Sequence, residues 1–169
     1  MRWLQLAMLA AIIGPAAQAV AAEKKVVVFA FELIDSSLEG QSNGKDLDET
    51  ARLDRLATDL RADIDAEPGF VLLDPAPVEA KARERWLNDC GRCAVQLGRE
   101  VGADIVVTGM VQKVSDLILN INAKGYDVAS GTTVAGGSVD IRGNTDEMWD
   151  RGLRSLWKNR LKKQLLALE

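Results

Sequence analysis

Apolar and polar residues alternate along this chain with several different periods, and each period predicts one kind of element. Val26 to Phe31 is an almost unbroken apolar run rich in β-branched residues, which is typical of a central strand. Residues 47–66 instead repeat apolar side chains at helical spacing, and Pro68 and Gly69 then stop the helix. Residues 70–73 form a second short apolar run. The first part of the chain therefore predicts strand, helix, strand, with a polar loop over 32–46.

The middle of the chain predicts two helices before the next strand. A charged helix is expected over 78–87, with Trp86 as its apolar anchor, and a short helix over 94–101. Gly102 is placed to end that helix in the left-handed conformation that glycine adopts at little cost. The β-branched run of residues 103–114 then predicts a buried strand.

From Leu117 the apolar residues alternate strictly with polar ones. Leu117, Leu119, Ile121 and Ala123 fall on one face of the predicted strand, and Asn120, Asn122 and Lys124 fall on the other. Ser130-Gly131 is a turn signal, so residues 117–128 and 133–142 are expected to form an antiparallel hairpin. This pattern predicts a sheet with one face in water.

The chain closes on an amphipathic helix. Asn144 is the expected N-cap, and Glu147 stands three residues later, where it would complete a capping box. The predicted order is strand, helix, strand, helix, helix, strand, strand, strand, helix. We therefore expect an α/β (α+β) fold, with one mixed sheet of about five strands covered by helices.

The first 22 residues read as a signal peptide. Arg2 precedes an apolar run over 4–14, and small residues follow, with cleavage sites after Ala19 or Ala22. The apolar run is too short to span a bilayer, and no later segment approaches a membrane span. We therefore expect a periplasmic protein whose single domain occupies residues 23–169.

The charge and residue content narrow the choice of functions. The net charge of −4 argues against nucleic acid or an anionic membrane surface as a partner. The chain contains no histidine, which excludes Ser-His-Asp and Cys-His catalysis and every histidine-ligated metal site. We expect no cofactor, no metal site and no catalytic residue.

Cys90 and Cys93 are the sharpest chemical candidates. Two cysteines three positions apart in an oxidising compartment most simply form a structural disulfide. The competing hypothesis is a thiol–disulfide redox protein, because a thiolate at a helix start beside Arg92 would be stabilised. A third hypothesis, a small-ligand or metal receptor, would use the loop from Asp35 to Asp46.

A second group of candidates lies at the junction between the last strand and the last helix. Arg142, Asn144 and Asp146 could contact an anion or a partner, because a helix start beside an arginine suits a carboxylate or phosphate. The alternative gives them structural roles in turning, capping and ion pairing. Asn120 and Asn122, on the wet face of their strand, fit either a partner surface or ordinary solvation.

The pattern resembles the periplasmic domain shared by CsgG, the N-terminal domain of TolB and the lipoprotein activators of penicillin-binding proteins. The resemblance rests on the stretches 25–31 (KVVVFAF), 70–73 (FVLL), 102–109 (GADIVVTG) and 127–131 (DVASG). It implies a mixed sheet covered by helices and a non-catalytic module that docks to other envelope proteins, with a homo-oligomer as one possible state.

Three further stretches resemble an uncharacterised family of short secreted proteobacterial proteins. They contain Cys-Gly-x-Cys, Val-Gln-Lys-Val-Ser and Asp-Ile-Arg-Gly-Asn-Thr-Asp motifs, within residues 89–93, 109–122 and 139–149. This second resemblance implies no particular biochemistry.

Overall fold

The computed structural model describes residues 23–44, 46–90 and 92–168, so the predicted signal peptide lies outside the described residues. The elements are β1 (Lys24–Asp35), α1 (Leu38–Asn43), α2 (Leu47–Asp65), β2 (Phe70–Leu73), α3 (Ala76–Arg83), α4 (Cys93–Glu100), β3 (Ile105–Ser115), β4 (Ile118–Asp127), β5 (Thr133–Ile141), α5 (Asp146–Leu156), a π-helical turn (Trp157–Leu161) and α6 (Lys162–Leu166). This order confirms the predicted fold class. Within the described residues, the structure adds the short α1 and divides the predicted last helix into α5, the π-helical turn and α6.

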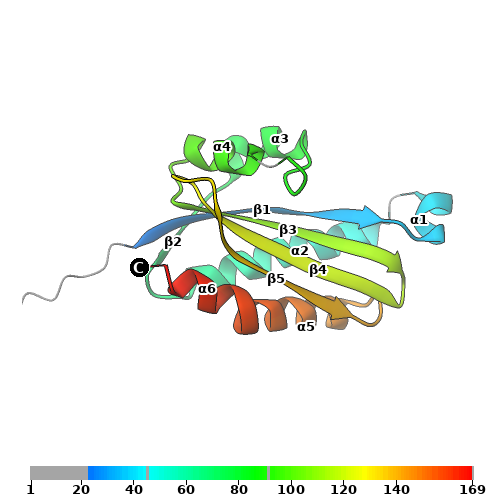
Figure 1. Cartoon of the computed structure of the whole chain (residues 1–169). Helices are drawn as coiled ribbons and strands as arrows, with labels where there is room; N and C mark the ends of the chain where they lie inside the picture. The colour runs from blue at the N-terminus through cyan, green and yellow to red at the C-terminus, as the bar shows by residue number, and fades with distance from the viewer. Residues whose placement is uncertain (1–22, 45, 91, 169) are drawn as a thin grey trace, which may run out of the picture.

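One mixed sheet forms the centre of the molecule, with strand order β2-β1-β3-β4-β5 (Figure 1). β1 pairs in parallel with both β2 and β3, whereas β4 is antiparallel to β3 and to β5. The parallel pairs need crossovers, which α2 and the α3–α4 segment provide. The β4–β5 pair is the predicted hairpin, and β3 and β4 form a second antiparallel pair that was not predicted.

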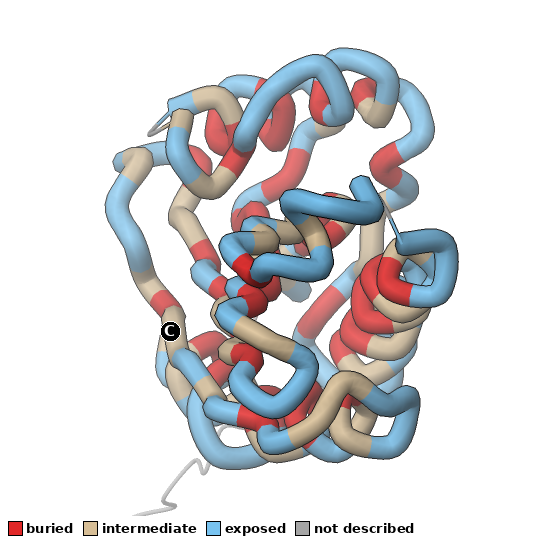
Figure 2. Tube along the Cα trace, turned by 90° about the vertical axis from the view of Figure 1, so that its right-hand side faces the viewer, coloured by how far each residue is buried: buried red, intermediate tan, exposed pale blue. Residues whose placement is uncertain are grey.

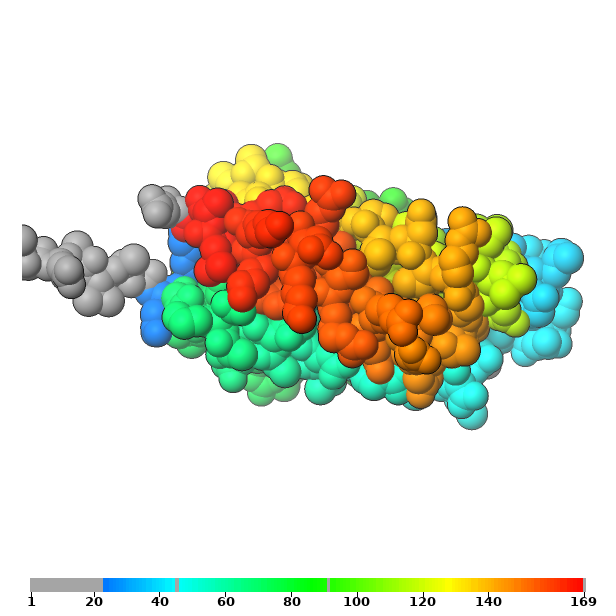
Figure 3. All heavy atoms as spheres, turned by 90° about the horizontal axis from the view of Figure 1, so that it is seen from below, coloured from blue at the N-terminus to red at the C-terminus, as the bar shows by residue number. Residues whose placement is uncertain are grey.

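Helices lie on both faces of the sheet. α2, α5 and α6 cover one face, and α3 and α4 lie above the other face near β2 (Figure 1). Viewed from below, α2 and the C-terminal helix lie side by side across the sheet (Figure 3). The larger core fills the α2 and α5 side and contains Leu56, Ile121 and Trp149, which are each 0% exposed. The smaller core, with Val27, Phe29 and Leu97, lies under α3 and α4.

Buried residues gather inside these layers, and the turns around them are exposed (Figure 2). The alternation along β4 is confirmed for Leu119, Ile121 and Ala123, which are all buried. Leu117 was wrongly placed with them, because it lies in the β3–β4 turn and its side chain is 71% exposed. Gly102 has a φ of 74°, which confirms the predicted left-handed end of α4.

Two boundaries differ from the prediction. β1 continues to Asp35, so residues 32–35 belong to a strand and not to a loop. α3 ends at Arg83, before Trp86, and its buried residues are Val78 and Ala82. Trp86 is therefore not a core anchor: its side chain is 53% exposed. No helix in the described part of the chain has both the length and the apolar character needed to cross a bilayer.

Candidate functional site

A buried ion pair lies at the end of the sheet where β1 and β3 finish. Lys113, on β3, is 4% exposed, and Glu49, on the first turn of α2, is 1% exposed. Lys113 follows Val107, Gly109 and Val111 on the face of β3 that packs against α2, so its ammonium group enters the core side of the sheet. Glu49 lies four residues before Leu53, on the buried stripe of α2.

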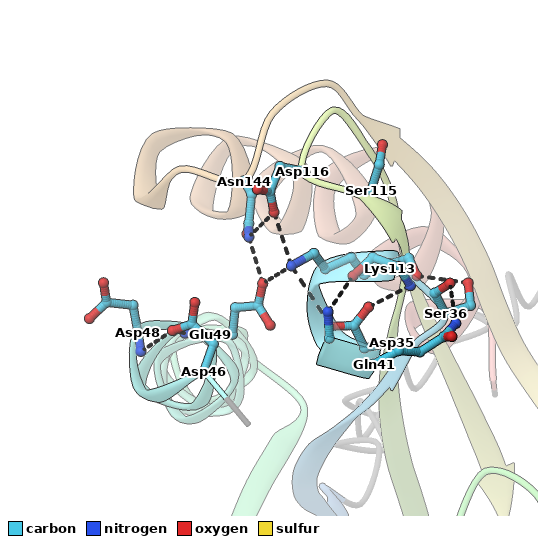
Figure 4. A network of polar contacts seen from close by, with 12 residues as sticks. Asp35, Ser36, Gln41, Asp46, Asp48, Glu49, Lys113, Ser115, Asp116 and Asn144 are labelled. Atoms are coloured by element: carbon cyan, nitrogen blue, oxygen red, sulfur yellow. Dashed lines mark hydrogen bonds and ion pairs between the residues drawn. The ribbon is translucent and has the colours of Figure 1, made fainter. Parts of the chain in front are cut away.

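Three carboxylates surround the ammonium group of Lys113 (Figure 4). The Nζ atom lies 2.6 Å from Glu49 Oε1, 2.9 Å from Asp116 Oδ1 and 3.8 Å from Asp35 Oδ2. Burial by itself would lower the pKa of Lys113, but the hydrogen bonds with Glu49 and Asp116 and the charges of Glu49 and Asp35 together raise it. Lys113 is therefore a permanent cation, not a neutral amine that could act as a nucleophile.

Asn144 extends this network to the β5–α5 junction. Its Nδ2 donates to Glu49 Oε1 at 2.6 Å and to Asp116 Oδ1 at 3.1 Å, while its Oδ1 accepts from the indole Nε1 of Trp149 at 2.9 Å. The predicted role of Asn144 as N-cap is wrong. Thr145 caps α5 by accepting from the Met148 amide, and Asn144 is used instead to join α5 to α2 and to the β3–β4 turn.

Asp146 and Arg142 lie on either side of Asn144 but have different surroundings. Asp146 accepts from Arg52 Nε at 2.7 Å and lies 3.1 Å from Arg55, so it ties α5 to α2. Hydrogen bonds from Arg52 and Arg55 lower the pKa of Asp146. Arg142 is exposed and forms no ion pair with the described residues. The structure therefore brings Asn144 and Asp146 into internal contacts and leaves Arg142 in solvent.

Asn120 and Asn122 lie on the other face of the sheet, in a row of hydrogen-bonded side chains. Asn122 Nδ2 donates to Asn120 Oδ1 at 2.5 Å, and Asn120 Nδ2 donates to Asp140 Oδ1 at 2.7 Å. Large apolar side chains stand beside this row. We call this surface the open face and define it by Ile34, Met110, Gln112, Val114, Ile118, Asn120, Asn122, Ser138 and Asp140.

The open face is the half of the sheet that α3 and α4 do not cover. In Figure 1 these two helices lie over the end of the sheet near β2, and among the described elements no helix lies over β4 and β5 toward α1. Ile34, Val114 and Ile118 are 42%, 58% and 48% exposed as a result. The face thus carries large apolar side chains in water, next to amides that are already hydrogen-bonded to one another.

Cys90 and Cys93 are joined in a disulfide, with their Cα atoms 5.5 Å apart. Cys93 is the first residue of α4, and its side chain packs against the smaller core. Gly91, between them, lies outside the described residues. The disulfide therefore closes a short turn that fixes the start of α4. The segment considered as a ligand loop, 35–46, is divided between the end of β1 and α1 and is not one open loop.

The buried ion pair was not predicted from the sequence, although the sequence contains a pattern that indicates it. Lys113 keeps the two-residue period of the buried face of β3, and Glu49 keeps the helical period of Leu53 and Leu56. A lysine on one buried face and a glutamate on another require each other, because an unpaired buried charge is costly.

Comparison with known proteins identifies the family and the fold. The family model DUF3280, described as "Protein of unknown function (DUF2380)", matches residues 24–161. No curated protein matches the sequence at a significant level.

Solved structures share the fold at low identity. The C-terminal domain of LpoB from Salmonella enterica is 14% identical with a TM-score of 0.50, over 75% of this chain and 87% of that one. The lipoprotein GNA1162 from Neisseria meningitidis is 17% identical with a TM-score of 0.51, over 86% of this chain and 99% of that one. These likenesses establish a common fold. Because the family model covers most of the sequence, the chain belongs to the DUF3280 family of proteins of unknown function.

Proposed function

We propose that the protein is a non-catalytic interaction module of the cell envelope, which works in the periplasm by docking to other envelope proteins. The observation that carries this proposal is the open face, where Ile34, Val114 and Ile118 stand exposed beside a row of amides. Contiguous exposed groups of large apolar side chains commonly mark sites of protein interaction.

The potentially reactive side chains are held in forms that favour binding over catalysis. Lys113 is held as a cation by Glu49 and Asp116, and both thiols are consumed in one disulfide. One protein of similar fold is described as a lipoprotein, which favours an envelope location. The predicted signal peptide favours the periplasm.

The location is tested by expressing the full chain in a Gram-negative host. We expect soluble protein in the periplasmic fraction, with an N-terminus at Val20 or Glu23. Recovery of unprocessed protein from the cytoplasm alone would refute the periplasmic assignment.

The interaction is tested by placing a photo-crosslinking amino acid at Ile118 on the open face, in cells that make the exported protein. Thr58, exposed on the outer side of α2, is the matched control position. We expect light-dependent adducts with a small set of envelope proteins from Ile118 and none from Thr58. Equal adducts from both positions, or none from Ile118, would show that the open face is not the docking surface.

A further inference from the structure

β1 has an edge that β2 leaves free. β1 is 12 residues long, but the four residues of β2 pair only with residues 24–27. Beyond this point the chain turns away through Asp74 and Pro75, and proline has no N–H group to continue a ladder. The guanidinium of Arg61 takes the next position and donates to the Val28 carbonyl at 2.8 and 3.1 Å.

Past Arg61, the backbone of Leu33 faces this edge without a partner among the described residues. The Ser36 N–H donates to the Lys113 carbonyl at 2.9 Å, so the alternate residues Ile34 and Glu32 also direct their backbone groups toward β3. Leu33 must then direct its N–H and C=O groups to the opposite edge. No hydrogen bond to the Leu33 backbone occurs within the described residues.

Two cavities adjoin this edge. The first, of about 460 Å³, runs along the edge between α2 and α3; Phe31, Leu33 and Leu53 line it on the α2 side, and Ala82 and several charged residues line it on the α3 side. A second cavity, of about 640 Å³, is lined by residues that include Ile34, Met110 and Gln112. Leu33 and Trp86 line both cavities, so the two meet at the free edge.

This arrangement matches the shape of an extended peptide. Successive side chains of a strand point to opposite faces, so a strand added here would place one side chain in each cavity. Asp89 supplies a carboxylate to the lining of the second cavity, and none of the lining residues described there is cationic. Asp89 has no ion pair within the described residues, and the exposed indole of Trp86 offers a face to a cation. A basic side chain therefore suits the second cavity, and an apolar one suits the α2 side of the first.

We propose that a partner protein adds an extended segment to the edge of β1 at Leu33, with an apolar side chain against the α2 side of the first cavity and a lysine or arginine against Trp86 and Asp89. This proposal rests on the proposed function and names its partner chemistry. The backbone of the segment supplies hydrogen bonds to Leu33, and the alternation of apolar and basic residues supplies the specificity.

The probe is a blocked heptapeptide with the sequence Ser-Val-Lys-Val-Lys-Val-Ser, titrated into the isotopically labelled mature protein and followed by NMR. We expect saturable shifts at Leu33 and Trp86 and slower hydrogen exchange of the Leu33 amide. Trp86→Ala and Asp89→Asn should each weaken binding by about threefold to tenfold. Asp65→Asn, at an exposed position at the end of α2 that lines neither cavity, is the control and should leave the affinity unchanged.

N-methylation of the peptide tests strand addition itself, since alternate N–H groups of a strand face opposite ways. A methyl group on a residue whose N–H faces β1 should abolish binding, whereas a methyl group on the next residue should be tolerated. Equal effects at successive residues would overturn the proposal, as would a peptide with glutamate for lysine that binds equally well.

Two other outcomes would also overturn the proposal. One is an absence of saturable binding at millimolar peptide. The other is a protein that dimerises alone and becomes monomeric on Trp86→Ala, because the occupant would then be a second copy of this chain. If the peptide does not bind but Ile118 still crosslinks in cells, strand addition is refuted and the interaction module is not. If the peptide does not bind and Ile118 does not crosslink, both proposals are refuted.

Discussion

Glu49→Gln removes one charge from the buried pair and leaves the shape of the side chain almost unchanged. Glu49 is 1% exposed and Lys113 is 4% exposed, so the remaining ammonium group would stay buried with weaker compensation. Losing one partner of a buried pair costs about 3–5 kcal/mol. Here Asp116 and Asp35 still face Lys113 at 2.9 and 3.8 Å, so we expect the smaller loss of about 2–3 kcal/mol in the free energy of unfolding.

The assay is urea unfolding at pH 7, followed by tryptophan fluorescence. The pKa of Lys113 is raised in the folded state, so its contribution is complete below its unfolded pKa of about 10.4 and is lost only at higher pH. Measurement at pH 7 therefore captures the whole effect. The matched control is Glu79→Gln, which breaks an exposed pair with Arg83 one helical turn away and should cost less than about 0.5 kcal/mol.

A second variant separates charge from packing. Lys113→Met alone leaves the Glu49 carboxylate buried without its cation. Lys113→Met together with Glu49→Leu removes both charges and should recover part of the lost free energy of unfolding. If Glu49→Gln cost no more than Glu79→Gln, the pair would not contribute to stability and the reasoning would be wrong.

Three further predictions concern other parts of the molecule. Hydrogen bonds from Lys113 and Asn144 lower the pKa of Asp116, so its contribution is present above its unfolded pKa of about 3.9 and is lost as the pH falls through the lower folded value. Urea midpoints of Asp116→Asn and of the wild-type protein should therefore differ at pH 7 and converge at low pH. Gly109→Ala would place a methyl group on the ring of Phe31 and should cost about 1–3 kcal/mol, whereas Gly136→Ala, which meets nothing closer than 3.6 Å, should fold normally. Reducing the Cys90–Cys93 disulfide should cost roughly 2 kcal/mol or less, because the closed loop is very short, and Cys93→Ala should trap no client proteins; trapped clients would favour the redox hypothesis.

The element order could be predicted from the sequence because the apolar residues of each element recur at the spacing of a helix or of a strand. The amphipathic stripe of α2 and the alternation of β4 are local properties, and both were predicted. β1 was predicted too short because Glu32 interrupts its apolar run. In the fold, the Glu32 carboxylate accepts from the backbone N–H groups of Leu87 and Asn88, more than fifty residues away. No local pattern encodes such a contact.

For the site residues too, local patterns could be predicted and contacts between distant residues could not. Asn144 has the spacing of a helix cap, and sequence alone could not reveal that Glu49, 95 residues earlier, competes for its side chain. Trp86 was expected in the core because tryptophan is large and apolar, yet α3 ends before it and leaves its ring at the surface. The disulfide was predicted because its two cysteines are neighbours in sequence.

Asp35 connects the buried network with the free edge of β1. Its Oδ2 atom faces Lys113 at 3.8 Å, and the same residue lines the cavity beside Trp86. The Lys113 carbonyl also accepts a hydrogen bond from the Ser36 N–H. The network therefore holds the end of β1 both through the backbone of Ser36 and through the side chain of Asp35. We therefore expect Glu49→Gln to speed hydrogen exchange of the Ser36 amide and to weaken binding of the patterned heptapeptide, although Glu49 lies outside both cavities. Glu147→Gln, which breaks an exposed pair with Arg151 and lies outside both cavities, should change neither. Faster exchange at Ser36 with an unchanged affinity would mean that the edge binds without help from the network, and that Lys113 serves stability alone.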